Sequence, residues 1–299
     1  MYTEHHYHAA DGLRLYYRQY GDSGATLLCL PGLTRNCRDF ERLAGHLGAQ
    51  YRVITPDLRG RGGSGRDPKP THYHPAQYVR DIWTLLNHLS VRRVIVIGTS
   101  LGGLLAMHMA EQFPRRLRGV VLNDIGPEIP VAAAQRIAEY AGRPREARDW
   151  PAAATICRQI YGAAYPNEDD RFWEDQARKS FRRRLNGDLT PDVDPVVGEA
   201  LRNGRRLAVW LARLRKWGLK RRFAGIQIEP WDAFRAIEGP CLLLHGALSD
   251  VLTPEIIKHM HSVKPDLRVT TIPNRGHAPT LDEPESRQAI DHFLAGLGA

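Results

Sequence analysis

The chain has 299 residues, of which 42% are hydrophobic and 25% charged, and its formal net charge is +9. This composition is typical of one large globular α/β domain with an insertion, and it excludes a fibrous or disordered chain. No run approaches about 18 apolar residues and the N-terminus lacks an apolar signal core, so we expect neither a membrane span nor a signal peptide. The four cysteines are not spaced as metal or redox motifs, which favours a reducing, cytoplasmic location.

Short apolar runs alternate with helical patterns along most of the chain. Residues 12–21 alternate in polarity and end in a glycine-containing turn at 21–24, which predicts an early hairpin. Continuous apolar strands separated by helices predict a mostly parallel sheet that is covered on both faces. The predicted strands are 25–32, 51–57, 91–98, 117–124, 240–250 and 267–274, and helical spacing marks 76–90 and 101–113.

Residues 128–235 have a different character, because they lack apolar strand runs and are rich in Ala, Arg and Trp. We predict a helical insertion, or cap, over 128–235, with the sheet domain formed by 1–127 and 236–299. One amphipathic helix face is expected in it. That face consists of Leu207, Trp210, Leu211, Leu214 and Trp217.

A serine between two glycines follows the strand predicted at 91–98. The segment Gly98-Thr99-Ser100-Leu101-Gly102 matches G-x-S-x-G at a strand-to-helix turn, the pattern of a nucleophile elbow. The glycines let strand and helix approach each other, and the helix N-terminus favours negative charge at the serine. A small-residue turn with an incidental serine is the alternative. We predict that Ser100 is a nucleophile.

A serine hydroxyl needs a base and an acid that orients the base. Among the 13 histidines, His277 lies in a loop after the last predicted strand. Asp250 follows another strand, and the order Ser100, Asp250, His277 is a known chain order for such a triad. Asp124 ends the strand before the insertion and is the alternative acid, although a polar residue there more often satisfies backbone groups.

With these motifs the chain resembles the α/β-hydrolase family with a cap domain. The resemblance runs from Leu30-Pro31-Gly32 through "PDLRGRGGSGR", the elbow, "GALSDVLTPE" and "GHAPTLDEPE". It implies an eight-stranded, mostly parallel sheet with helices on both faces and a helical lid after strand six. It also implies an oxyanion hole made by the N–H groups of Leu33 and Leu101, no metal and no cofactor; some relatives carry the acid at the position of Asp124.

These residues predict a serine hydrolase that cleaves a carboxylic ester or lactone through an acyl-enzyme on Ser100. The serine rules out the dehalogenase and epoxide-hydrolase relatives, which use an aspartate nucleophile. The Thr99-Ser100-Leu101 elbow, with Ala278 after the histidine, disfavours cleavage of a carbon–carbon bond in ring-cleavage products without excluding it. A non-catalytic ligand-binding protein on the same fold is the other alternative.

The aromatic residues of the insertion are candidates for the substrate pocket, and they favour an apolar or aromatic small molecule. They are Tyr140, Tyr161, Trp210, Trp217 and Trp231. The alternative is that most of them form the core of the insertion.

The segment 60–65 satisfies G-x-G-x-x-G, but no helical pattern follows it, so we expect no dinucleotide. Basic residues are scattered, which argues against a nucleic-acid partner, and the oligomeric state stays open.

Overall fold

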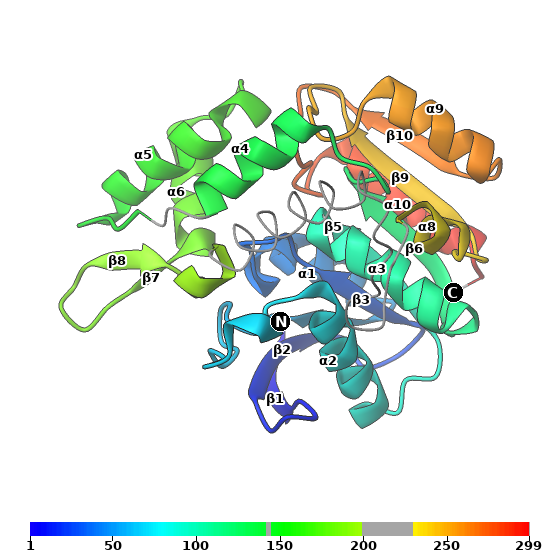
Figure 1. Ribbon diagram of the computed structural model, residues 1–299, viewed down its shortest axis with the longest axis horizontal. Helices are drawn as coiled ribbons and strands as arrows, with labels where there is room; N and C mark the ends of the chain where they lie inside the picture. Colours follow the sequence, from blue (N-terminus) through cyan, green and yellow to red (C-terminus); the bar gives the residue numbers. More distant parts are fainter. Residues whose placement is uncertain (142–144, 199–229, 299) are drawn as a thin grey trace, which may run out of the picture.

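The computed structural model describes residues 1–141, 145–198 and 230–298 (Figure 1). Its centre is an eight-stranded sheet of order β1-β2-β4-β3-β5-β6-β9-β10. The first two pairings, β1 with β2 and β2 with β4, are antiparallel, and all others are parallel. The strands are β1 (Thr3–His8), β2 (Arg14–Tyr20), β3 (Thr26–Leu30), β4 (Arg52–Pro56), β5 (Val94–Thr99), β6 (Leu117–Asn123), β9 (Cys241–Gly246) and β10 (Arg268–Ile272). The predicted mostly parallel sheet is confirmed.

Helices cover both faces of this sheet because its central strands are apolar on both sides. In β3, Leu28 packs into the core beneath α2, α3, α8 and α9, whereas Leu27 packs into the core beneath α1 and α10. The helices are α1 (Glu41–Leu47), α2 (Pro75–His88), α3 (Leu101–Gln112), α8 (Pro230–Arg235), α9 (Pro254–Val263) and α10 (Pro284–Gly296). Single 3-10 turns are η1 (Cys37–Phe40), η2 (Pro70–His72), η3 (Pro114–Arg116) and η4 (Gly162–Ala164).

The early hairpin lies one turn earlier than the sequence indicates. β1 pairs with β2, and the turn between them contains Gly12 at φ +82°. The segment 21–24 instead crosses to β3, which is separated from β2 by β4. Glycine is needed at both positions. A Cβ on Gly21 would lie 2.3 Å from the Gly48 oxygen, and a Cβ on Gly24 would lie 2.2 Å from the Gln50 oxygen. These glycines allow a close crossing of two chain segments rather than a hairpin turn.

Between β6 and β9 the chain forms the insertion. Helices α4 (Val131–Ala141), α5 (Trp150–Tyr161) and α6 (Asp170–Ser180) lie beside the carboxyl edge of the sheet (Figure 1). α5 and α6 share a small core of their own around Cys157 and Trp173. A hairpin of β7 (Phe181–Arg183) and β8 (Leu189–Pro191) follows. The insertion was predicted to be helical, but it therefore also contains strands.

The predicted end of the insertion is also wrong. Helix α8 falls inside the range 128–235, but it packs against α3, and Ala233 and Phe234 are buried in the core of the sheet domain. The chain has therefore returned to the sheet domain by Pro230. The amphipathic face at 207–217, with Trp210 and Trp217, lies outside the described residues.

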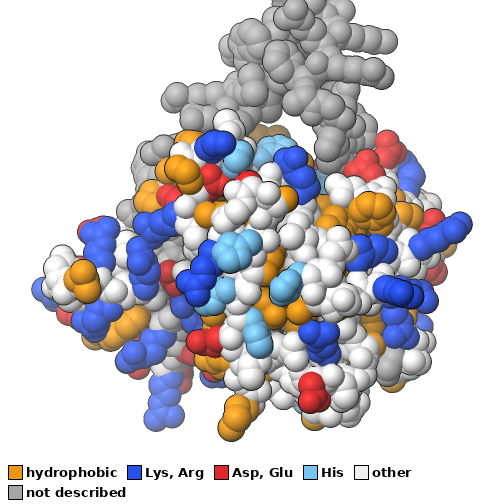
Figure 2. All heavy atoms as spheres, turned by 90° about the horizontal axis from the view of Figure 1, so that it is seen from below, with side chains coloured by type: hydrophobic (Ala, Val, Ile, Leu, Met, Phe, Trp, Pro, Cys, Tyr) orange, Lys and Arg blue, Asp and Glu red, His pale blue; other side chains and the backbone are white. Residues whose placement is uncertain are grey.

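Basic side chains are dispersed over the surface. Figure 2 shows Lys and Arg on many parts of one face, interspersed with acidic and uncharged groups. The four cysteines are free thiols and all are buried; burial raises the pKa of the Cys241 thiol to about 12. Within the described ranges, no helix is both long and apolar enough to cross a bilayer.

Candidate active site

Ser100 sits at a sharp turn between β5 and α3. Its backbone adopts φ 52° and ψ −114°, a conformation that L-residues rarely occupy, and its N–H donates to the Asn123 carbonyl at 3.1 Å. The flanking glycines permit this turn. A Cβ on Gly98 would lie 2.4 Å from the Gly102 carbonyl carbon, and a Cβ on Gly102 would lie 2.1 Å from the Leu30 oxygen. The strand and helix therefore meet backbone to backbone, and the serine projects from the sheet edge.

The Gly102→Ala substitution is expected to destabilise the fold by about 3 kcal/mol or more, because the added methyl meets a backbone oxygen that cannot rotate away. Gly45→Ala is the matched control. Gly45 lies in α1, and a Cβ there meets nothing within 4 Å. That variant should be neutral or slightly more stable. Urea unfolding followed by circular dichroism measures both; equal midpoints for the two variants would contradict the packing argument.

His277 lies in the loop between β10 and α10 and contacts Ser100. Its Nε2 is 2.8 Å from Ser100 Oγ, and its Nδ1 is 2.9 Å from Asp124 Oδ2. A carboxylate only accepts hydrogen bonds, so the arrangement assigns the proton to Nδ1 and leaves Nε2 free to accept the serine proton. The histidine side chain is 7% exposed and the aspartate side chain 0%.

Asp124 follows β6 directly and is held by several hydrogen bonds. Its N–H donates to the Leu244 carbonyl at 2.8 Å, and its φ of 55° turns the side chain toward the strand end. Oδ1 accepts the Gly246 N–H at 2.8 Å, and Oδ2 accepts the Ser249 hydroxyl at 2.6 Å as well as His277. These donors stabilise a buried carboxylate that would otherwise be costly to keep charged.

Asp250 does not contact His277, so the structure corrects the expected choice of acid. Its two carboxylate oxygens accept from Arg136 of α4 at 2.8 and 2.7 Å, and its side chain is 50% exposed. The turn after β9 directs Ser249 inward to Asp124 and the next residue outward. The acid that reaches the histidine is the alternative candidate, Asp124.

The expected oxyanion donors lie beside Ser100. Leu101 is the first residue of α3, so its N–H has no acceptor within the helix. Leu33 lines the same cavity as Ser100, in the turn that follows β3. Its carbonyl accepts from Arg61 Nε and Nη2 at 2.9 and 2.8 Å. No role for Arg61 follows from the sequence alone; its place in the glycine-rich segment 60–65 is the available signal.

The insertion contacts the loop that carries His277. The Gly276 N–H donates to the Ala164 carbonyl at 2.7 Å, and the Tyr165 hydroxyl donates to the Ala278 carbonyl at 2.5 Å. Arg275 adds an ion pair with Glu168 at 2.6 Å. Residues on both sides of His277 are thus tied to the insertion, which no local sequence pattern indicates.

Tyr165→Phe is expected to lower kcat about three- to tenfold with little change in KM, because the loss of one hydrogen bond loosens the histidine loop. The steady-state kinetics of a chromogenic ester measure this. Tyr7→Phe is the control, since the Tyr7 hydroxyl also donates to a backbone carbonyl, that of Asp81 at 3.2 Å, but within the core. A parallel fall in kcat for both variants would indicate a general loss of stability instead.

A cavity of about 90 Å³ opens at Ser100 and His277. Its wall joins the turn after β3, the histidine loop and the insertion, and Tyr140 and Tyr161 both line it, as does Tyr165. Trp231 does not line this cavity as predicted; its ring lies tilted against that of His259 of α9, with ring centroids 3.8 Å apart. Trp210 and Trp217 are outside the described residues.

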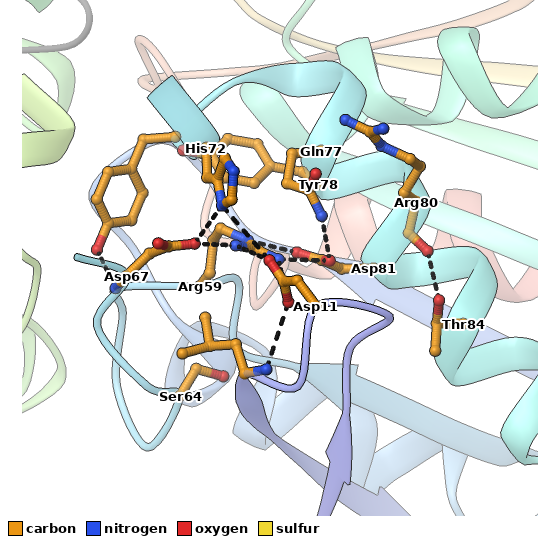
Figure 3. A network of polar contacts seen from close by, with 12 residues as sticks. Asp11, Arg59, Ser64, Asp67, His72, Gln77, Tyr78, Arg80, Asp81 and Thr84 are labelled. Carbon is orange, nitrogen blue, oxygen red and sulfur yellow. Dashed lines mark hydrogen bonds and ion pairs between the residues drawn. The ribbon is translucent and has the colours of Figure 1, made fainter. Parts of the chain in front are cut away.

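Asp11, Asp67 and His72 form one cluster with the geometry of metal ligands in the described part of the chain. Figure 3 shows the Arg59 guanidinium among these carboxylates, where it also binds Asp81 at 2.7 and 2.8 Å. Arg59 donates to Asp67 and to Asp11. The cation of this cluster is therefore an arginine, and the cluster joins the β1–β2 turn to α2.

Comparison with known proteins agrees with this architecture. The model of the alpha/beta hydrolase fold family matches residues 25–284. The chain belongs to the α/β hydrolase family. It therefore belongs to a family of enzymes, as the sequence predicts.

Two curated relatives and one solved structure match along almost the whole chain. The chain is 32% identical to a 3-hydroxybutyrate-oligomer hydrolase of Cupriavidus necator, over 95% of this chain and 93% of the relative. It is 24% identical to a 2-(acetamidomethylene)succinate hydrolase of Mesorhizobium japonicum, over 91% of this chain and 88% of that protein. The crystal structure of an α/β hydrolase from Novosphingobium aromaticivorans is 38% identical, with a TM-score of 0.87 over 98% of both chains.

Proposed function

We propose that this α/β hydrolase cleaves a short carboxylic ester through an acyl-enzyme on Ser100. The observation that carries the proposal is the unbroken hydrogen-bonded chain from Asp124 through His277 to Ser100 at the wall of a cavity. This arrangement supports the proposal, because nucleophilic catalysis needs a nucleophile, a base in reach of it, and an acid that orients the base.

In the proposed reaction, His277 Nε2 takes the proton of Ser100 while Oγ attacks the ester carbonyl. The N–H groups of Leu33 and Leu101 stabilise the negative oxygen of the tetrahedral intermediate. The histidine then protonates the leaving alcohol. In the second half of the reaction it takes a proton from water as the water attacks the acyl carbonyl, and it returns this proton to Ser100 Oγ as the carboxylic acid leaves. Asp124 keeps the ring in the required tautomer and stabilises its positive form.

The surroundings of the nucleophile support a small substrate with an apolar part. A second cavity, of about 60 Å³, shares Arg35, Tyr140 and Tyr161 with the first. Apolar side chains of the insertion make up much of its remaining wall; they include Ile156, Ile160, Phe181 and Val193. We propose a short acyl chain, in keeping with the small volumes of these two cavities. The relative from Cupriavidus necator is named as a hydrolase of 3-hydroxybutyrate oligomers, and we propose short esters of hydroxy acids as substrates.

The test is a panel of p-nitrophenyl esters from acetate to decanoate, with small lactones beside them. The proposal expects the acetate and butyrate esters to be cleaved fastest and the rate to fall for longer chains. No turnover of any ester or lactone, with intact folding, would contradict it and return carbon–carbon cleavage or ligand binding to consideration.

We also propose a cytoplasmic location, which the four buried free thiols support.

A further inference from the structure

Lys179 lies in the last turn of α6 and lines the cavity at Ser100 together with Gln176 on the same helix face. Residues of the sheet domain hold this turn of α6 through a backbone carbonyl. The Lys179 carbonyl accepts from Asn36 Nδ2 at 2.9 Å and from Arg38 Nη2 at 2.8 Å. The side chain is not required for that docking, although it is only 12% exposed.

Arg35 is the second cation of the cavity wall, and its charge is already matched. Its Nε and Nη2 donate to the two carboxylate oxygens of Asp39 at 2.8 and 2.6 Å. Nη2 also donates to Gln176 Oε1 at 3.0 Å, and Nη1 donates to the Ser180 hydroxyl. A bidentate pair of this kind leaves little charge to attract a ligand.

The Lys179 ammonium is less completely matched. It has three N–H donors, and its ion-pair partner among the described residues is Asp175, with Nζ 2.8 Å from Oδ2. The Asp175 side chain is 37% exposed and also lies 4.0 Å from Arg42, so water and a second cation share its charge. The nearby carboxylate of Asp282 is bound by Arg287 at 3.1 Å and by Arg42 at 3.6 Å.

The wall of the cavity carries more cations than carboxylates among the described residues, and each of these cations has a carboxylate partner. Of the described residues that line it, Arg35 and Lys179 are cations and Asp39 is the carboxylate. A Cβ built on Gly32 would lie 3.4 Å from Arg35 Cγ and 3.9 Å from Ser100 Cβ, so the Arg35 side of this wall lies beside the serine. A mostly buried ammonium gains from a further anionic partner.

We propose that Lys179 binds a carboxylate of the substrate, so that the enzyme acts on short esters that also carry a free acid group. This inference rests on the proposed ester hydrolysis and adds the class of substrate to it. The substrate carboxylate accepts hydrogen bonds from one or two N–H groups of Lys179, and this contact holds the ester carbonyl at Ser100. Esters of the same length without the acid group lack this contact and are poorer substrates.

The experiment compares two matched pairs of substrates by kcat/KM. One pair is p-nitrophenyl hydrogen succinate and its methyl ester, with the acid on the acyl side. The other is the linear dimer of 3-hydroxybutyrate and its methyl ester, with the acid on the alcohol side; cleavage of the internal ester is followed by chromatography. The wild type should prefer the acid in at least one pair. Lys179→Met should reduce that preference roughly ten- to a hundredfold, and Lys179→Arg should retain part of it.

Lys258→Met is the matched control, because Lys258 is exposed on α9 and does not line the cavity. It should keep the preference of the wild type. Equal rates for acid and methyl ester in both pairs, or a preference that survives Lys179→Met, would overturn the inference while ester hydrolysis stands. If the wild type cleaves neither pair nor p-nitrophenyl acetate, the proposed function itself fails, and this inference falls with it.

Discussion

Asp124→Asn is expected to lower kcat for ester hydrolysis by about 10⁴-fold, the loss seen when the acid of such a triad becomes an amide. The amide can donate to His277 Nδ1, which favours the tautomer with its proton on Nε2. That tautomer cannot accept the proton of Ser100. KM should change much less, because the buried Asp124 side chain does not line the cavity.

Asp250→Asn is the control for this prediction, since Asp250 also follows a strand but faces Arg136 and solvent. Its kcat should stay within about twofold of the wild type, as expected when an exposed ion pair is lost. Steady-state kinetics on p-nitrophenyl acetate measure kcat and KM of each variant, and thermal melting shows whether each variant is folded. A large loss in Asp250→Asn together with an active Asp124→Asn would reverse the assignment of the acid.

Ser100→Ala is expected to lower kcat by about 10⁶-fold. The small rate that remains would come from the oxyanion donors and from substrate binding. The substitution removes the only atom that forms the acyl-enzyme in the proposed reaction. The fold should be preserved, because the Ser100 backbone bonds to Asn123 and Leu104 do not involve the side chain.

Covalent labelling with a fluorophosphonate separates chemistry from stability. The wild type should gain one label per chain, and peptide mass spectrometry should place it on Ser100. Ser100→Ala should gain none, whereas Ser262→Ala, which removes an exposed hydroxyl on α9, should label like the wild type. A label on another residue of the wild type would show that the nucleophile has been assigned wrongly.

The parts of the site that were predictable depend on residues close together in the sequence. The elbow is readable because Gly98 and Gly102 leave room for backbone contacts that any side chain would block. The strands were readable because β3, β5 and β6 are buried on both faces and are therefore continuously apolar. The early hairpin was misplaced because glycines at 21–24 serve a close crossing as readily as a turn.

The amino-acid sequence by itself determined the strand-to-helix turn at Ser100, the candidate histidine loop and the mostly parallel sheet, since each follows from local conformation and apolar patterning. Only the tertiary structure decided between two aspartates that both follow strands. β6 lies between β5 and β9, so Asp124 emerges beside Ser100, while the turn after β9 points Asp250 at Arg136. The contacts of Tyr165 and Lys179 likewise depend on where the insertion folds back. Pairings between distant segments are set by packing, and no short stretch of sequence encodes them.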